Sequence, residues 1–329
     1  MKVLFIGGTG KISSACAQLA VERGIELYLL NRGQTSARPA PAAARILPGD
    51  IRDKGSASQA LGDLTFEAVV NWIAFTPEHI ELDLDLFRGR TRQYIFISSA
   101  SVYQTPPVNL PITESTPLDN PYWEYSRAKI ACEDRLVQAY RQEKFPMTIV
   151  RPSHTYDKTM LPFTGGYTVV DRMRKGKKVI VHGDGTSLWT LTHHRDFAKG
   201  FVGLLGNNHA VGEAFHITSD ELLTWNQIFE IVARAAGVEA RLVHIPSDFI
   251  AAFDPSWGAG LLGDKSHSVI FDNTKIKRVV PDFAAAIPYV RGAEEVIGWY
   301  DADPARQQVD EALDQLMDRI VAAYESAWP

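Results

Sequence analysis

The sequence predicts an α/β fold, with a doubly wound parallel sheet and a smaller, mostly C-terminal lobe. Two observations predict it: short β-rich runs alternate with helical patterns through the first half of the chain, and a glycine cluster stands where the first run ends. Strands that alternate with helices form a parallel sheet covered on both faces. With 329 residues, 45% of them hydrophobic, the chain is long enough to bury a large core.

Each element rests on a local pattern. Residues 2–6 form a β-rich run that ends in glycines, and residues 11–23 follow with apolar side chains at helical spacing until Gly24. The alternation then continues, with strands expected at 26–30, 44–47, 68–71, 93–97 and 147–150 and helices at 54–61, 77–87 and 123–143. Residues 194–205 and 214–217 are expected to return to the sheet, before helices at 225–236 and 305–323.

Composition argues against several classes of partner. The formal net charge is −5, from 34 basic and 39 acidic residues without a block of like charges, which argues against nucleic acid and anionic membranes. No stretch approaches the roughly 20 apolar residues that span a bilayer. Cys16 and Cys132 fit reduced core thiols. We therefore expect a cytoplasmic protein that acts on a small molecule.

The histidines do not predict a metal site. No HxxxH or HxH pattern occurs, and adjacent histidines on a helix point about 100° apart, so we expect core or pocket histidines. His154, which follows an Arg-Pro pair, is the one expected to face a ligand.

The glycine cluster lies between the first strand and the first helix. Backbone N–H groups and a helix N-terminus at such a turn can face a pyrophosphate, and glycines leave room for its approach. The third small position is Ser13 in place of glycine, which still allows close helix packing. The residues predicted to bind a dinucleotide here are Gly7, Gly8, Thr9, Gly10, Lys11 and Ile12.

The end of the second strand bears on the choice of dinucleotide. A carboxylate there would bind the ribose hydroxyls of NAD, but the chain has Asn31 and Arg32. Because an arginine suits a 2′-phosphate, NADP(H) is preferred, while NAD(H) remains possible through Asn31. After the third and fourth strands, the adenine is expected at Asp50 and Ile51, and the cofactor is expected alongside Asn71, Trp72, Ile73 and Ala74.

Tyr125 and Lys129 stand four residues apart on a predicted helix. They therefore share a face, and the ammonium can lower the phenol pKa from about 10 toward the working pH. A hydroxyl from Ser99, at the end of an apolar run, can hydrogen-bond a substrate oxygen while hydride moves. This pattern predicts acid/base chemistry at Tyr125.

Beyond Pro152, the regular alternation of strands and helices gives way to loops, aromatic residues and shorter elements. We expect residues 1–155, joined by 190–218, to form the dinucleotide-binding domain. Residues 156–189 and 219–329 are expected to form the substrate-binding lobe.

In six segments, taken in order, the chain resembles the extended short-chain dehydrogenase/reductase superfamily, of the NAD-dependent epimerase/dehydratase type. The segments are GGTGKIS at 7–13, GDI at 49–51, NWIA at 71–74, ISSASVY at 97–103, YSRAK at 125–129 and RPSHTY at 151–156. The resemblance implies a Rossmann-type fold, with Ser99, Tyr125 and Lys129 as the catalytic triad and Lys129 also on the nicotinamide ribose. It implies further cofactor contacts from Ser98, Pro152, Ser153 and His154, and a possible homodimer through helices near 77–87 and 123–143.

Departures from the family pattern bear on the substrate. Sugar-nucleotide epimerases usually carry an asparagine after the sixth strand and an arginine in a later segment; here the first is missing and Trp189 stands near the second position. An indole cannot clamp a phosphate bidentately, which favours another substrate, although Arg195 and Lys158 could substitute. Ala100 and Ser101 replace the Asp-Glu pair that a sugar 4,6-dehydratase needs.

The leading hypothesis is an NAD(P)-dependent oxidoreductase or epimerase-type enzyme that transfers hydride between nicotinamide and a secondary alcohol or ketone. One alternative is a sugar-nucleotide epimerase with atypical phosphate contacts. Another is a non-catalytic NAD(P)- or RNA-binding relative, since chloroplast stem-loop-binding proteins also resemble this superfamily. The intact Ser99, Tyr125 and Lys129 favour retained chemistry.

Overall fold

A seven-stranded parallel sheet forms the centre of the larger lobe. The computed structural model describes residues 1–33 and 38–327. The chain runs outward from β1 to β3 and then crosses to the other side of β1, so its winding reverses between β1 and β4; this confirms the predicted doubly wound sheet. The strands, in spatial order, are β11 (Ala214–Ile217), β6 (Met147–Pro152), β5 (Tyr94–Ile97), β4 (Ala68–Asn71), β1 (Lys2–Ile6), β2 (Glu26–Asn31) and β3 (Arg45–Pro48).

Helices cover both faces of this sheet. Alternate residues of β1 point to opposite faces, and all four from Val3 to Ile6 are fully buried, which is why the strand reads as a continuous apolar run. One face packs against α1 (Ser13–Glu22), α6 (His194–Val202) and α10 (Thr274–Val279). The other packs against α2 (Lys54–Leu61), α3 (Pro77–Phe87) and α4 (Glu124–Gln138).

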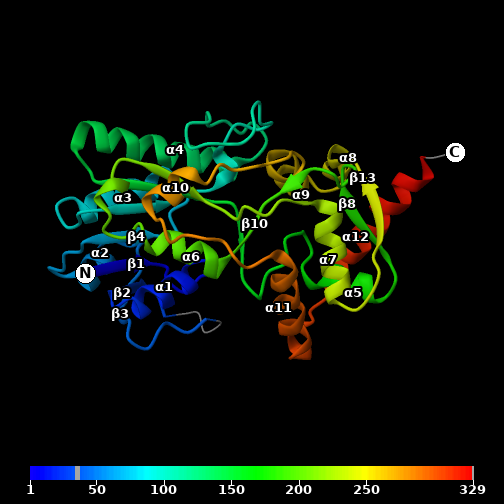
Figure 1. Cartoon of the computed structure of the whole chain (residues 1–329), viewed down its shortest axis with the longest axis horizontal. Helices are drawn as coiled ribbons and strands as arrows, with labels where there is room; N and C mark the ends of the chain where they lie inside the picture. Colours follow the sequence, from blue (N-terminus) through cyan, green and yellow to red (C-terminus); the bar gives the residue numbers. More distant parts are fainter. Residues whose placement is uncertain (34–37, 328–329) are drawn as a thin grey trace.

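The smaller lobe has its own core. Figure 1 shows it at the opposite end of the long axis from the sheet. Its helices enclose a cluster of buried aromatic and aliphatic side chains, and two strand pairs link segments far apart in the sequence. Its elements are α5 (Tyr167–Arg174), β8 (Lys178–His182), β9 (Leu188–Trp189), β12 (Leu223–Thr224), α7 (Trp225–Ala235), β13 (Arg241–Ile245), α8 (Ser247–Phe253), α9 (Pro255–Gly260), α11 (Tyr289–Asp301) and α12 (Glu311–Ser326).

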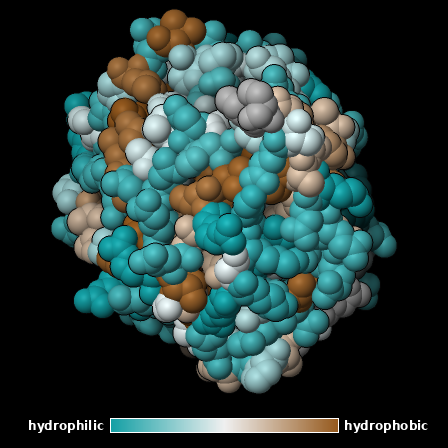
Figure 2. Space-filling model, turned by 90° about the vertical axis from the view of Figure 1, so that its right-hand side faces the viewer, coloured by the Kyte–Doolittle hydropathy of each residue, from teal (hydrophilic) through white to brown (hydrophobic). Residues whose placement is uncertain are grey.

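Strands β7 (His154–Tyr156) and β10 (Leu191–His193) pair in parallel where the chain passes between the lobes. Seen from the end of the smaller lobe, the surface is mainly hydrophilic with separate hydrophobic patches (Figure 2). No helix within residues 1–33 and 38–327 is long and apolar enough to cross a membrane.

Predicted and observed helices differ mainly near the C-terminus. The helix expected at 305–323 begins only at Glu311, because Pro304 starts a short 3-10 turn and the carboxylate of Asp310 caps α12 by accepting from Leu313 N at 3.0 Å. Helices α5, α8, α9, α10 and α11 were not predicted. In the sheet lobe, the helix expected at 123–143 is α4 followed by one π turn at Ala139–Glu143.

One segment assigned to the substrate lobe, α10 with the residues after it, packs on the sheet. Val280 and Phe283 lie in the same buried cluster as α1 and α6. Gly200 in α6 and Gly203 directly after it make this possible: a Cβ at Gly203 would lie 2.4 Å from Val280 Cγ1, and one at Gly200 would lie 3.1 Å from a ring carbon of Phe283. Placing all of 219–329 in the smaller lobe therefore does not fit these contacts. The rest of the predicted division stays a prediction, as does the homodimer through α3 and α4.

Candidate functional site

A cavity of about 540 Å³ opens at the carboxyl ends of β1, β4, β5 and β6 and reaches into the smaller lobe. In open α/β sheets, ligands commonly bind at this edge, next to the point where the winding of the sheet reverses. Thirteen of the predicted site residues line it: Gly7, Gly10, Lys11, Ile12, Trp72, Ile73, Ser98, Ser99, Tyr125, Lys129, Pro152, Ser153 and His154.

The other predicted site residues do not line this cavity. Arg32 follows β2 and Asp50 follows β3; the Arg32 side chain is 60% exposed, and its Nη1 is 3.8 Å from Asp50 Oδ2. Ile51 and Ala74 are buried, so they shape the site from behind. The full set outside the lining is Gly8, Thr9, Asn31, Arg32, Asp50, Ile51, Asn71 and Ala74.

The glycine turn is held by a side chain that the sequence analysis treated only as a mild departure. Gly7 has φ +83°, and a Cβ there would lie 2.7 Å from Ile73 Cγ2, so both conformation and space require glycine. Ser13 Oγ donates to Gly7 O at 2.9 Å and accepts from Gly10 N at 2.8 Å. A glycine at position 13 would lack this bridge across the turn.

Asn71 acts from behind the cavity wall. Its side chain is fully buried, its Oδ1 accepts from Ile73 N at 2.8 Å, and its Nδ2 donates to Asp83 Oδ2 at 2.5 Å. Tyr94 also donates to that carboxylate. Burial raises the pKa of Asp83 to about 7. Asn71 thus fixes the turn after β4 and does not itself face the cavity.

Tyr125 and Lys129 lie on the first turns of α4, as their spacing predicted. Lys129 Nζ is 5.8 Å from the centre of the Tyr125 ring and 4.6 Å from that of Phe75. It also donates to Ala74 O at 2.6 Å and Ile97 O at 2.8 Å. Burial lowers the pKa of Lys129 to about 8. Burial also raises the pKa of Tyr125, so the predicted lowering of the phenol pKa by the Lys129 ammonium is wrong for the protein without ligands.

Ser99 reaches the same place from the end of β5. Hydrogen bonding to Ser99 opposes the effect of burial on the pKa of Tyr125. Ser99 Oγ also lies 2.9 Å from Ser101 Oγ, which in turn accepts from Ser126 Oγ at 2.8 Å. The three predicted side chains therefore converge, and a short chain of hydroxyls fixes Ser99.

His154 lines the cavity from β7. Its Nε2 is buried and has no hydrogen-bond partner within the described chain. Burial lowers the pKa of His154 to about 3, so the ring is neutral at physiological pH. Among residues 1–33 and 38–327, no group of three or more His, Cys, Asp or Glu side chains could hold a metal ion.

Asp264 and Lys265, which were not predicted as site residues, enter the cavity from the smaller lobe. They end a π turn at Leu261–Lys265, in a segment that carried no motif. Lys265 Nζ is 3.3 Å from Asp264 Oδ2 and lies 5.7 Å from the ring centre of Trp123. Trp123 and Trp189 also line the cavity beside them.

The family model of the NAD dependent epimerase/dehydratase family matches residues 3–218. The chain belongs to this family. That match confirms the resemblance. It also shows that the protein is of the NAD-dependent epimerase or oxidoreductase kind.

Relatives of this family member include two different kinds of protein. It is 26% identical over 267 residues to the chloroplast stem-loop binding protein of 41 kDa b from Arabidopsis thaliana, covering 75% of this chain and 67% of the relative. It is 31% identical over 169 residues to the UDP-glucose 4-epimerase of Lactobacillus helveticus, covering 46% of this chain and 51% of that enzyme.

Solved structures confirm the fold of this epimerase/dehydratase family member. Epimerase Mth375 from Methanothermobacter thermautotrophicus matches with a TM-score of 0.76 at 16% identity, covering 93% of this chain and 94% of that one. The UDP-glucose 4-epimerase from Bifidobacterium longum, in complex with NAD+ and UDP, matches with a TM-score of 0.72 at 18% identity, covering 92% and 99%. At these identities the likeness concerns the fold alone.

Proposed function

We propose that the protein is an NAD(P)-dependent enzyme that transfers hydride between nicotinamide and a secondary alcohol or ketone. The observation that carries the proposal is the convergence of Ser99, Tyr125 and Lys129 in one cavity that begins at the glycine turn. A bound nicotinamide cofactor would supply the hydride donor or acceptor. The chain supplies the proton transfer and holds the reacting carbon.

Tyr125 moves the proton in this proposal. In reduction, its hydroxyl protonates the oxygen of the ketone as hydride reaches the carbon, and in oxidation its phenolate takes that proton back. Ser99 Oγ donates a hydrogen bond to the same oxygen and shares its developing charge. Bonds to two backbone carbonyls hold the Lys129 ammonium 5.8 Å from the centre of the Tyr125 ring, and in this proposal its charge opposes the effect of burial and favours the phenolate.

An epimerase would use these groups twice, first to oxidise a hydroxyl and then to reduce the ketone from its other face. The UDP-glucose 4-epimerases among the relatives support this variant. The triad does not distinguish it from a simple reductase. Turnover without added NAD(P), by protein that retains its cofactor through purification, favours the epimerase, whereas strict dependence on added cofactor favours the reductase.

The experiment that tests the proposed function measures hydride transfer directly. Purified protein is incubated with NAD+ or NADP+ and a panel of secondary alcohols, and reduced nicotinamide is followed by its absorbance. A deuterium label on the reacting carbon is expected to appear on the nicotinamide ring. Failure of every alcohol and ketone tested, with cofactor shown to be bound, would contradict the proposal.

We propose that NADP(H) is the preferred cofactor. Arg32 follows directly after β2, and its side chain is 60% exposed, so the guanidinium can reach a 2′-phosphate. We expect Arg32→Ala to weaken NADPH binding by about tenfold or more, the value of a charge-assisted contact, and NADH binding far less. Dissociation constants for the two cofactors, measured by nicotinamide fluorescence, check this. Equal losses for both would show that Arg32 reads no 2′-phosphate, and NAD(H) would then be the cofactor.

RNA binding is the second candidate, favoured by the likeness to the chloroplast stem-loop binding protein. The net charge of −5 gives RNA phosphates little to bind. A gel-shift assay over a range of salt concentrations decides between the two: binding that falls steeply with salt supports RNA recognition, and no shift at low salt dismisses it.

A further inference from the structure

We propose that Asp264 and Lys265, with Trp123 and Trp189, form a subsite that recognises adjacent hydroxyl groups of a small sugar carrying no nucleotide. This inference rests on the proposed function and names the substrate class of the same cavity. It depends on four features: the anchoring of Lys265, its pairing with Asp264, the aromatic walls and the shortage of phosphate-binding groups.

The backbone at Lys265 is fixed by three side chains of the smaller lobe. Its carbonyl oxygen lies 3.0 Å from His182 Nε2 and accepts from Trp225 Nε1 at 3.1 Å and Ser187 Oγ at 3.3 Å. The Trp225 ring is fully buried. These bonds hold the backbone of Lys265 at the cavity wall in the absence of a ligand. Ligand binding therefore costs little conformational entropy at this position.

The two side chains offer complementary hydrogen-bonding groups. Lys265 Nζ is 3.3 Å from Asp264 Oδ2, with side chains only 17% and 19% exposed. An ammonium donates hydrogen bonds and a carboxylate accepts them. The pair therefore matches two neighbouring hydroxyl groups, because a hydroxyl can act as donor or as acceptor. Because the pair carries no net charge, it suits a neutral polyol better than an anion, which would have to displace Asp264 from Lys265.

Aromatic rings flank the pair. Lys265 Nζ lies 5.7 Å from the centre of the Trp123 ring and 5.9 Å from that of Trp189. The partly buried Trp123 indole can provide apolar contact for the C–H face of a sugar ring while the sugar hydroxyls reach Asp264 and Lys265, and Trp189, only 2% exposed, backs this wall. Trp123 also lies 5.0 Å, centre to centre, from Tyr125, so a sugar on this wall reaches the proposed acid/base.

The cavity lacks the groups that a nucleotide diphosphate would need. No arginine lines it in the described chain, and its lysines are Lys11, Lys129 and Lys265. Lys11 follows the glycine turn, Lys129 is bonded to two carbonyls and Lys265 is paired with Asp264. A diphosphate at this end would therefore face the Asp264 carboxylate without a bidentate partner.

Binding and turnover are tested separately. Tryptophan fluorescence is titrated with D-galactose, D-xylose, UDP and UDP-galactose in the presence of cofactor. We expect at least one free sugar to change the signal at millimolar concentration, and Lys265→Met and Asp264→Asn each to weaken its binding by about tenfold or more, the effect of one lost charged hydrogen bond. Lys275→Met is the matched control: that ammonium also pairs with a carboxylate, Glu213 at 2.7 Å, and lies 4.9 Å from the centre of the Phe215 ring, but outside the cavity.

Three outcomes would overturn the subsite: no free sugar binds, UDP-galactose binds at least tenfold more tightly than every free sugar, or the two cavity variants bind as the control does. Circular dichroism of each variant confirms folding before titration. The two proposals fail separately. Sugar binding without hydride transfer would contradict the proposed function alone, and hydride transfer on an alcohol that Asp264→Asn leaves unaffected would contradict the subsite alone.

Discussion

Tyr125→Phe is expected to bind cofactor as the unaltered protein does and to lose turnover by about 10²- to 10⁴-fold, the usual contribution of a positioned general acid or base. The substitution removes only the hydroxyl, so the packing of the ring, 5.0 Å from Trp123 and 6.5 Å from Phe75, is retained. Steady-state rates and a fluorescence titration with NAD(P)H measure the two effects. Comparable turnover in the variant would remove Tyr125 from the mechanism.

The pH dependence of the reaction tests the partner of Tyr125. The folded-state pKa of Lys129 is lowered to about 8, so its ammonium is present below that pH and is lost as the pH rises through it. The support that Lys129 gives to the phenolate should fade over the same range. We expect Lys129→Met to lower the rate at neutral pH. The variant should also lose the fall in rate that the unaltered protein shows as the pH rises through about 8. An unchanged profile in Lys129→Met would show that another group titrates there.

The sequence predicted those parts of the site that local geometry sets. Tyr125 and Lys129 meet because an α-helix brings residues four apart to one face. The glycine turn and Ser99 meet them because parallel strands end at one edge of the sheet. Both contacts can be predicted because residue spacing and the geometry of a single helix or of a parallel sheet are enough to bring these residues together.

The rest of the site depends on packing between distant segments. Asp264 and Lys265 reach the cavity only because His182, Ser187 and Trp225 hold the Lys265 carbonyl, and no periodicity in the sequence signals that arrangement. Likewise, α10 packs on the sheet because Gly203, directly after α6, leaves room for Val280, a complementarity visible only in three dimensions. A substrate lobe built from separate segments is therefore the part that sequence patterns predict least well.

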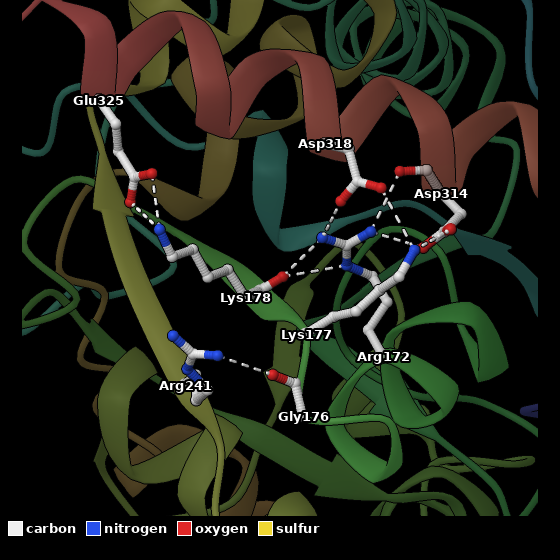
Figure 3. A network of polar contacts seen from close by, with 8 residues as sticks. All are labelled: Arg172, Gly176, Lys177, Lys178, Arg241, Asp314, Asp318 and Glu325. Atoms are coloured by element: carbon white, nitrogen blue, oxygen red, sulfur yellow. Dashed lines mark hydrogen bonds and ion pairs between the residues drawn. The ribbon is translucent and has the colours of Figure 1, made fainter.

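Arg172→Met is expected to loosen the smaller lobe strongly. Its guanidinium is 1% exposed and donates to Lys178 O, to Asp314 Oδ1 at 2.5 Å and to Asp318 Oδ1 at 2.7 Å, joining α5 and β8 to α12 (Figure 3). Without it, the Lys178 carbonyl loses its side-chain donor and the carboxylates of α12 face each other with only Lys177 between them. Removing one partner of a fully buried ion pair costs about 3 to 5 kcal/mol of unfolding free energy. Because the Asp318 side chain is 52% exposed and Lys177 still pairs with both carboxylates, we expect the lower end of that range, about 3 kcal/mol.

Arg174→Met, on the same helix, is the matched control. Arg174 pairs with Asp301, but its side chain is 27% exposed and its partner's is 44% exposed, so its loss should cost about 0 to 1 kcal/mol. Hydrogen exchange resolved along the chain measures both variants, and α12 should exchange much faster in Arg172→Met only. Because the proposed cofactor contacts come from the sheet lobe, NAD(P)H affinity should change little in either variant. Equal exchange of α12 in both would mean that the apolar residues of α12, and not this buried cation, hold the helix in place.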